Sequence, residues 1–152
     1  MSLLGKLETD VQVKVAANKF HDVFACRPHH VSNMTPGNIQ GCELHEGEFG
    51  KSGTVICWNY VHDGEAKVAK EIVEAVDDDN LSTTFKVIEG DLLKDYKSFR
   101  LIVKANPVGP EECSVHWILE YEKLHDAIVD PHTLLQFCAE VSQDIEAHLL
   151  KG

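Results

Sequence analysis

Paired cysteines, basic residues and long apolar runs are all scarce in this sequence of 152 residues. The five cysteines are scattered and show no Cys-x-x-Cys spacing, which argues against a disulfide framework or a structural zinc site. No apolar run approaches the roughly 20 residues that cross a bilayer, and the first residues do not have the form of a signal peptide. We therefore expect a cytoplasmic protein that does not insert into membranes.

The charge balance is strongly acidic. Asp and Glu number 25 against 14 Lys and Arg, which gives a formal net charge of −11. A field of this sign repels phosphate backbones, so nucleic acid and anionic membrane are not expected as partners. A hydrophobic content of 43% is ordinary for a folded protein, and neither a repeat nor a linker-like stretch divides the chain. We expect one domain over residues 1–152.

The hydrophobic pattern changes twice near the start of the chain. Residues 7–15 alternate strictly, with Val11 and Val13 on the apolar face, which predicts a half-buried strand. Residues 16–34 then show helical spacing that is interrupted at Pro28. Because proline breaks a helix, this segment is predicted to form two short helices.

Six further strands are predicted, separated by turn-forming pairs such as Asp63-Gly64 and Gly90-Asp91. Connections this short require neighbouring strands to be antiparallel. The predicted strands cover approximately residues 39–46, 54–61, 66–77, 82–89, 98–106 and 112–123.

A long helix is predicted over residues 130–150, with Asp130 as its capping residue and Pro131 at its first position. Leu134, Cys138 and Val141 lie on its apolar stripe. The order of elements predicts an α+β fold, in which a curved seven-stranded antiparallel sheet wraps around this C-terminal helix. One helix, about 10–12 Å across, cannot fill so wide a concave surface, so large side chains fill the rest or a cavity remains.

Strand alternation separates the residues that face the helix from those that face solvent. The parity of residues 68–72 also places Lys70 on the inner face, as the one charged exception there. Tyr60, Thr83 and Tyr121 are the candidate polar groups of the interior, because their hydroxyls can donate and accept hydrogen bonds. The inward residues are Ile56, Trp58 and Tyr60; Thr83, Phe85 and Val87; Phe99, Leu101 and Val103; and Val115, Trp117, Leu119 and Tyr121.

Eight characteristic segments are spread along the chain: IQGCELHEG (39–47), GKSG (50–53), WNYVHDG (58–64), VAKE (68–71), FKVIEGD (85–91), YKSF (96–99), LEYEKL (119–124) and DPHTLL (130–135). In these segments the chain resembles the major latex protein-like group of the birch-pollen-allergen (pathogenesis-related class 10) superfamily of plants. The resemblance extends over essentially the whole chain. It implies the START-like helix-grip fold, with a large hydrophobic cavity between the sheet and the last helix.

The resemblance also implies a function, which is to bind small hydrophobic or amphipathic molecules such as sterols, hormones, flavonoids or alkaloids inside the cell, in connection with plant defence and stress. The expected partner is therefore a small ligand, and the protein is expected to be a monomer or weak dimer without a cofactor. The residues expected to line the cavity are Phe24, Ile56, Trp58, Tyr60, Val68, Thr83, Phe85, Val87, Phe99, Leu101, Val103, Val115, Trp117, Leu119, Leu134, Phe137, Cys138 and Val141.

A glycine-rich loop contains Gly47, Gly50 and Gly53, and its Gly-Lys-Ser triplet resembles the end of a phosphate-binding Walker A motif. That motif requires glycine where His45 lies, and a helix after the loop, whereas a strand is predicted here. The loop is interpreted instead as a tight connection of the family, at the entrance to the cavity together with the short helices and the last helix.

Two enzymatic alternatives remain open. The first is catalysis on a cavity-bound, alkaloid-like substrate, which would need an acid or base inside, and the predicted inward sets contain none at their centres. The second is ribonuclease activity, with which the net charge of −11 agrees poorly. The nine histidines show no metal-binding spacing, and no nucleophile is visibly paired with a base. We therefore expect no catalytic residue and no metal site.

Overall fold

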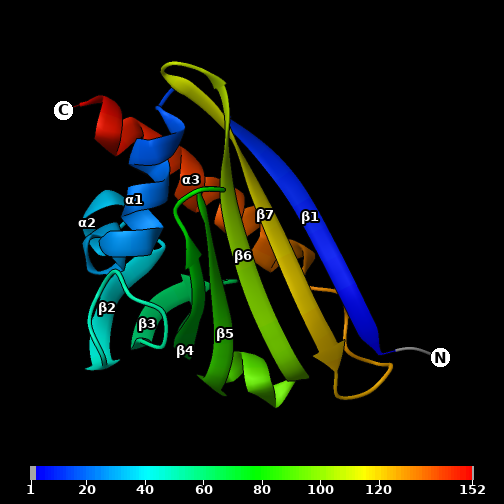
Figure 1. Cartoon of the computed structure of the whole chain (residues 1–152). Coiled ribbons are helices and arrows are strands. Elements are labelled where there is room, and N and C mark those ends of the chain that lie inside the picture. Colours follow the sequence, from blue (N-terminus) through cyan, green and yellow to red (C-terminus); the bar gives the residue numbers. More distant parts are fainter. Residues whose placement is uncertain (1–2, 152) are drawn as a thin grey trace.

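Seven strands form one antiparallel sheet in the computed structural model, which describes residues 3–151 (Figure 1). The strands are β1 (Leu4–Val13), β2 (Ile39–Glu46), β3 (Val55–His62), β4 (Glu65–Asp77), β5 (Ser82–Gly90), β6 (Tyr96–Gly109) and β7 (Glu112–Lys123). Their order across the sheet is β1-β7-β6-β5-β4-β3-β2, so the first two strands of the chain form its opposite edges. The predicted antiparallel sheet is confirmed.

The helices lie on one face of this sheet (Figure 1). The long α3 (His132–Leu150) crosses the concave face, while α1 (Ala17–Cys26) and α2 (Val31–Met34) connect the two edge strands. Single-turn 3₁₀ helices occupy Pro28–His30 and Asp91–Lys94. At the end of α2, the Thr35 hydroxyl donates to an Asp144 carboxylate oxygen of α3 at 2.7 Å. The predicted α+β fold, with two short helices between the first strands, is confirmed.

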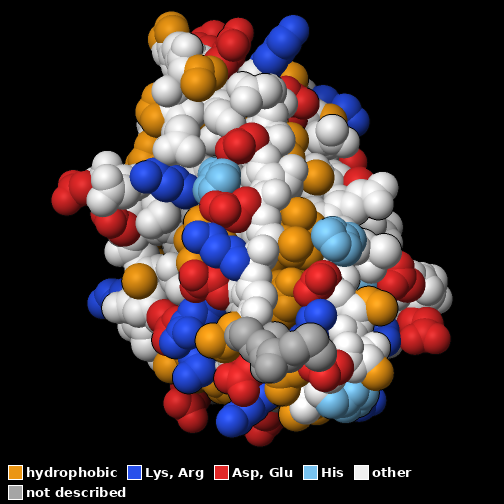
Figure 2. Space-filling model, turned by 90° about the vertical axis from the view of Figure 1, so that its right-hand side faces the viewer, with side chains coloured by type: hydrophobic (Ala, Val, Ile, Leu, Met, Phe, Trp, Pro, Cys, Tyr) orange, Lys and Arg blue, Asp and Glu red, His pale blue; other side chains and the backbone are white. Residues whose placement is uncertain are grey.

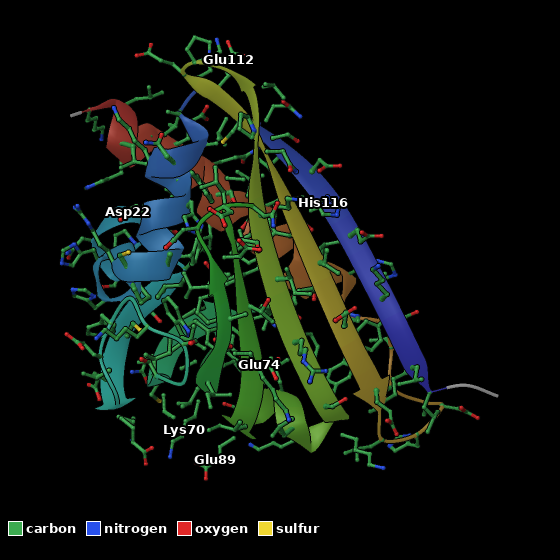
Figure 3. The ribbon with its side chains drawn as sticks, viewed as in Figure 1. Asp22, Lys70, Glu74, Glu89, Glu112 and His116 are labelled. Atoms are coloured by element: carbon green, nitrogen blue, oxygen red, sulfur yellow. The ribbon has the colours of Figure 1, made fainter. Side chains whose placement is uncertain are left out.

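The outer face of the sheet carries both polar and apolar side chains. β1 pairs with β7 without interruption from Leu4 opposite Glu122 to Val13 opposite Cys113. On this outer face His116 lies between two acidic side chains of β1, with ring nitrogens 2.9 Å from Glu8 and 2.7 Å from Asp10 (Figure 3). Seen from the side that carries β1, acidic, basic and apolar side chains are interspersed (Figure 2).

The middle of the sheet is less regular, because the pairing of β4 with β5 shifts between Lys70 and Glu71 and again between Val73 and Ala75. Such bulges change which residues of a strand face the core. Before the second shift the odd-numbered Glu71 and Val73 are buried, whereas after it the even-numbered Val76 packs against the core. The residues of β4 that face the core are therefore odd-numbered before the second bulge and even-numbered after it.

The helix α3 begins two residues later than predicted. Its first residue is His132, and no side chain caps its N-terminus. The predicted capping role of Asp130 is wrong, because its carboxylate is used elsewhere. It accepts a hydrogen bond from the Tyr121 hydroxyl at 2.7 Å and pairs with the Lys123 ammonium at 2.9 Å. Asp130 thus ties the loop before α3 to the end of β7.

A buried hydrogen-bond chain joins the middle of α3 to the sheet. The Trp117 indole donates to the Ser142 hydroxyl at 2.7 Å, and Ser142 donates to the Cys138 carbonyl at 2.9 Å. Both side chains are almost completely inaccessible to solvent. The contact satisfies the one polar atom of a large aromatic core residue and sets the height of α3 above the sheet.

We expect Ser142→Ala to lower the free energy of unfolding by about 1–3 kcal/mol, because the buried Trp117 indole loses its acceptor. Denaturant unfolding followed by fluorescence measures the change. The control is Ser114→Ala, which removes an exposed hydrogen bond with Gln12 and should change stability by less than about 0.5 kcal/mol. Equal effects of the two variants would contradict this role of Ser142.

Candidate functional site

An apolar cavity of about 70 Å³ lies between the sheet and α3. Its walls come from α1, α3 and the six strands β2 to β7, together with the 3₁₀ turn that contains Leu92. The lining residues are Phe24, Ile39, Trp58, Tyr60, Ala69, Glu71, Phe85, Leu92, Leu101, Trp117, Leu134, Phe137, Cys138 and Val141. The resemblance implied a large cavity, and the cavity of this structure is smaller than that.

Six of the fourteen lining residues are aromatic. Phe24 is packed edge-on against Trp117, with ring centroids 5.3 Å apart, and against Phe85 at 6.3 Å. Trp58 meets Phe85 at 6.3 Å, again in an edge-on arrangement. These rings come from α1, β3, β5 and β7, and their mutual packing leaves the remaining space at the centre of the sheet.

The structure brings many of the predicted lining residues to this cavity and places others elsewhere. Val68 is on the outer face and 41% exposed, so its predicted place in the lining is wrong. Ile39, Ala69, Glu71 and Leu92 line the cavity but were not predicted to do so. The predicted residues that the structure brings to the cavity are Phe24, Trp58, Tyr60, Phe85, Leu101, Trp117, Leu134, Phe137, Cys138 and Val141.

The other predicted residues are buried on the same face without reaching this cavity. Thr83 and Val103 line a separate, narrower recess beneath α1, next to Phe20. Phe99 is enclosed between the rings of Tyr96 and Tyr121, at centroid distances of 5.0 and 5.9 Å. The remaining core residues of this group are Ile56, Val87, Val115 and Leu119.

Glu71 is the acidic side chain of the cavity lining. It extends from β4 opposite Ile56 of β3 and is only 5% exposed. The Trp58 side chain donates a hydrogen bond to it. Burial raises the pKa of Glu71 to about 8, and the hydrogen bond from Trp58 lowers it in part. At neutral pH the carboxyl group is therefore mostly protonated in the folded protein.

Lys70, the predicted inward charge, points the other way. Its ammonium lies 3.6 Å from the Glu89 carboxylate, and both side chains project from the outer edge of the fold, away from α3 (Figure 3). The inward charge of β4 is thus an acid instead of a base. The expectation that no acid or base lies at the centre of the inward sets is also wrong, because Glu71 lies there.

The three predicted polar groups have different environments. Tyr60 lines the cavity, where burial, and secondarily the Glu71 carboxyl, raise its pKa. The Thr83 hydroxyl is buried and has no hydrogen-bond partner among residues 3–151. Tyr121 lies away from the cavity and donates to Asp130. Tyr60 is therefore the one of the three that contacts the cavity.

The glycine-rich loop closes against the segment between α1 and α2. The Phe49 ring stacks on His29 with centroids 4.0 Å apart. Gly47 has a φ of +86°, and a side chain there would meet the Thr54 backbone. Gly50 and Gly53 also have positive φ values, and the loop leads into β3, not into a helix. This geometry lacks the helix N-terminus that a Walker A motif requires.

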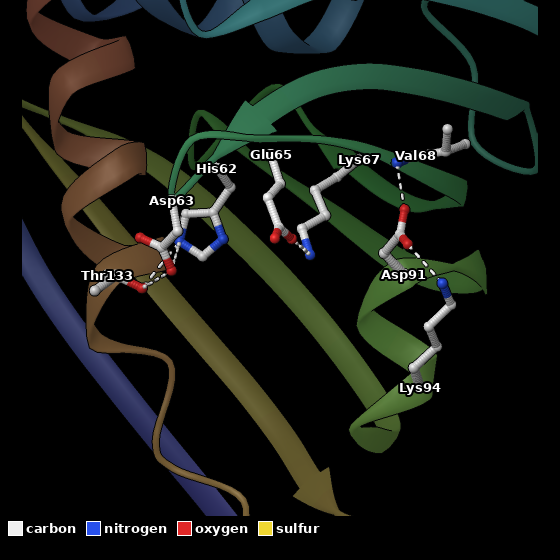
Figure 4. A network of polar contacts seen from close by, with 8 residues as sticks. All are labelled: His62, Asp63, Glu65, Lys67, Val68, Asp91, Lys94 and Thr133. Atoms are coloured by element: carbon white, nitrogen blue, oxygen red, sulfur yellow. Dashed lines mark hydrogen bonds and ion pairs between the residues drawn. The ribbon is translucent and has the colours of Figure 1, made fainter.

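A polar network fastens the start of α3 to the turn between β3 and β4 (Figure 4). The Thr133 hydroxyl donates to Asp63 at 3.2 Å and lies 2.9 Å from a ring nitrogen of His62. Nearby, Asp91 accepts from the Val68 amide at 2.8 Å and from Lys94 at 3.0 Å. The network lies beside Leu134 and Phe137, so it determines how closely α3 covers this end of the cavity.

Other chemistry finds little support in residues 3–151. They contain no cluster of three or more metal-ligating side chains, and none of their helices is long and apolar enough to span a membrane. Cys26, although largely exposed, has a raised pKa, first from partial burial of its thiol and then from its hydrogen bond with Asp22. A raised pKa disfavours the thiolate that a nucleophilic cysteine would need.

Comparison with known proteins identifies relatives over the whole chain. The model of the pathogenesis-related protein Bet v 1 family matches residues 2–152. MLP-like protein 31 of Arabidopsis thaliana is 59% identical over 98% of this chain and 88% of its own length. MLP-like protein 28 of the same plant is 60% identical over 98% of this chain, which spans 45% of that relative.

Among solved structures, the crystal structure of major latex-like protein 151 from Panax ginseng superposes with a TM-score of 0.93. It is 49% identical in sequence, and the alignment covers 96% of this chain and 97% of the ginseng protein. The arrangement of the sheet around α3 is therefore shared with a major latex-like protein.

We expect Glu71→Gln to change how stability depends on pH. Because the folded-state pKa of about 8 exceeds the ordinary 4.5, the folded protein holds a proton that the unfolded chain releases between these values. The Glu71 contribution therefore lowers stability as pH rises through this window, by several kcal/mol at most, since one pKa unit corresponds to about 1.4 kcal/mol.

The measurement is the free energy of unfolding at pH 5, 6, 7 and 8 for the original protein and the variant. The stability of Glu71→Gln relative to the original should increase with pH, and taking the difference cancels groups common to both. Glu89→Gln, at an exposed position of β5, is the control and should show no such trend. A pH-independent difference for Glu71→Gln would contradict the burial argument.

Proposed function

We propose that this chain, which belongs to the pathogenesis-related protein Bet v 1 family, binds a small hydrophobic or amphipathic ligand between its sheet and α3. The observation that supports this most directly is the apolar, aromatic-walled cavity at the centre of the fold, with Glu71 and Tyr60 as its polar groups. Ligand sites in proteins are mostly of this kind, apolar with a few polar groups that orient the ligand. Membership of the family supports a ligand-binding fold.

The proposed site must widen when it is occupied. Pockets for drug-sized ligands measure roughly 300–1,000 Å³, whereas this cavity has about 70 Å³. The half-buried Phe137, Leu92 and Leu101 are the lining residues best able to move, because solvent lies on one side of them. Outward rotation of Phe137 and displacement of the start of α3 would open the end that the Thr133 network covers.

Burial of apolar ligand surface supplies the binding energy. Each Å² removed from water contributes about 25 cal/mol before the costs of ordering the ligand and opening the site. We further propose that the protein stores or carries such a ligand in the cytoplasm as a monomer or weak dimer, in connection with plant defence. Sterols, hormones, flavonoids and alkaloids are the proposed classes.

Glu71 is the specific observation that favours a second candidate, catalysis on a cavity-bound substrate. A buried carboxyl whose pKa lies near 8 can act as a general acid or base at neutral pH. Incubation of the protein with a bound candidate ligand, followed by mass spectrometry, separates the two functions. A carrier returns the ligand unchanged, whereas an enzyme converts it and loses this activity in Glu71→Gln.

We expect Val141→Phe to weaken ligand binding without lowering the melting temperature. Val141 is 2% exposed and lines the cavity, so the larger ring occupies space that the ligand would take. In a fully packed core the same change would cost about 1–3 kcal/mol of stability. The affinity for an apolar solvatochromic dye should fall at least tenfold, which corresponds to about 1.4 kcal/mol.

The control is Gln143→Phe, on the exposed face of α3, which should leave dye affinity and melting temperature unchanged. A large drop in the melting temperature of Val141→Phe with unaltered dye binding would contradict a site in this cavity. Absence of saturable dye binding to the folded original protein would contradict the proposed function as a whole.

A further inference from the structure

Glu71 is the acidic side chain of the cavity lining, and no ion pair is formed with it among the described residues. Its carboxyl is buried at the wall of the cavity, where its identified hydrogen-bond donor is the Trp58 side chain. A carboxylate offers about four acceptor positions, so one donor leaves most of its capacity unused. Buried polar groups are normally satisfied, which makes a donor supplied from the cavity the expected complement.

The elements packed around Glu71 supply no positive charge. The titratable groups that it influences are Tyr60 and Cys57 on β3, Cys42 on β2 and Cys138 on α3. Each is neutral at physiological pH, since burial raises the pKa of every one of these side chains. Lys70 faces outward to Glu89, and none of the described lining residues is Lys, Arg or His.

We propose that Glu71 anchors an amphipathic amine: the ligand's ammonium group binds the Glu71 carboxylate, and its apolar ring body fills the space between Trp58, Phe85 and Phe137. This inference rests on the ligand-binding function proposed above and specifies its ligand class. The ammonium group stabilises the ionised carboxylate that burial alone disfavours, and the resulting pair has no net charge.

The surroundings of Glu71 suit a cation for two further reasons. The faces of Trp, Tyr and Phe rings attract an ammonium group within about 6 Å, and six of the fourteen lining residues carry such rings. The net charge of −11 also raises the local concentration of cations over that of anions or neutral molecules. A ligand that carries a carboxylate or phosphate at this end would instead meet a like charge.

Proton exchange accompanies binding. Because burial raises the pKa of Glu71 to about 8, a cationic amine that binds at neutral pH displaces the carboxyl proton, which leaves to the solvent. Affinity for the cation should therefore increase between pH 6 and pH 8 and then level off. A neutral ligand should show no such increase.

Three probes of nearly equal shape test the anchor: 2-phenylethylamine, 2-phenylethanol and propylbenzene, which end in an ammonium, a hydroxyl and a methyl group. Their affinities are measured by displacement of the apolar dye and by calorimetry at pH 6, 7 and 8. We expect Glu71→Gln to weaken the amine at least tenfold at pH 8, and to change the other two probes less than threefold.

The matched control is Glu89→Gln, which removes a carboxylate from the outer face and should leave all three affinities unchanged. Near-ultraviolet circular dichroism checks that both variants are folded. The inference is overturned if the amine is insensitive to Glu71→Gln, if the alcohol loses as much affinity as the amine, or if the affinity of the amine does not rise with pH.

The outcome separates this inference from the function on which it rests. If the dye and propylbenzene bind but the amine does not depend on Glu71, ligand binding stands and the amine anchor fails. If neither the dye nor any probe binds to the folded protein, the proposed function fails and the anchor fails with it.

Discussion

The interior of this fold follows from one geometric constraint, which is that a single helix must cover a seven-stranded curved sheet. A helix with its side chains is about 10–12 Å across, and the concave face is wider than that. Large aromatic residues of α1, β3, β5 and β7 fill most of the difference, and the space that they leave is the cavity. The buried Trp117–Ser142 hydrogen bond fixes the position of α3 over the sheet, because the indole and the hydroxyl must stay within bonding distance. The cavity is thus a consequence of how the layers meet.

Within this apolar interior Glu71 is costly. A carboxyl whose pKa lies near 8 in the folded state and near 4.5 when unfolded destabilises the fold at neutral pH. A hydrophobic residue would avoid this cost, as Ala69 and Val73 do at the neighbouring inward positions of β4. Perturbed ionisable groups in cavities are more frequent at functional sites than elsewhere. The position of Glu71 therefore connects the stability of the empty protein to the chemistry of its proposed ligand.

The fold could be predicted from the sequence to a large extent, and the site only in part. Strand alternation, turn residues and the apolar stripe of α3 identified nearly all elements, because each pattern reflects burial of a whole face. Alternation says which face a residue occupies but not how deep it lies, so Val115 and Leu119 pack in the core while Trp117, between them, reaches the cavity. Depth depends on the path of α3 over the sheet, which is a tertiary property. The capping role expected of Asp130 failed similarly, since Tyr121 and Lys123 compete for its carboxylate.

Glu71 is the more instructive error, because a usable signal was present in the sequence. The two-residue turn Asp63-Gly64 pairs His62 with Glu65, and continuing this register places Glu71 opposite the inward Ile56. Hairpin register fixes the face of the first half of β4. The parity that placed Lys70 inward instead assumed that the apolar Val68 faces the core, whereas Val68 is exposed and the residues of the other parity are buried. The register that a tight turn sets holds until the first bulge. The face that each residue of a hairpin strand occupies is therefore best assigned by counting from the turn. In β4, counting from the turn places Glu71 on the inner face, whereas the apolar pattern places Lys70 there. The difference decides whether the cavity attracts a cation or an anion.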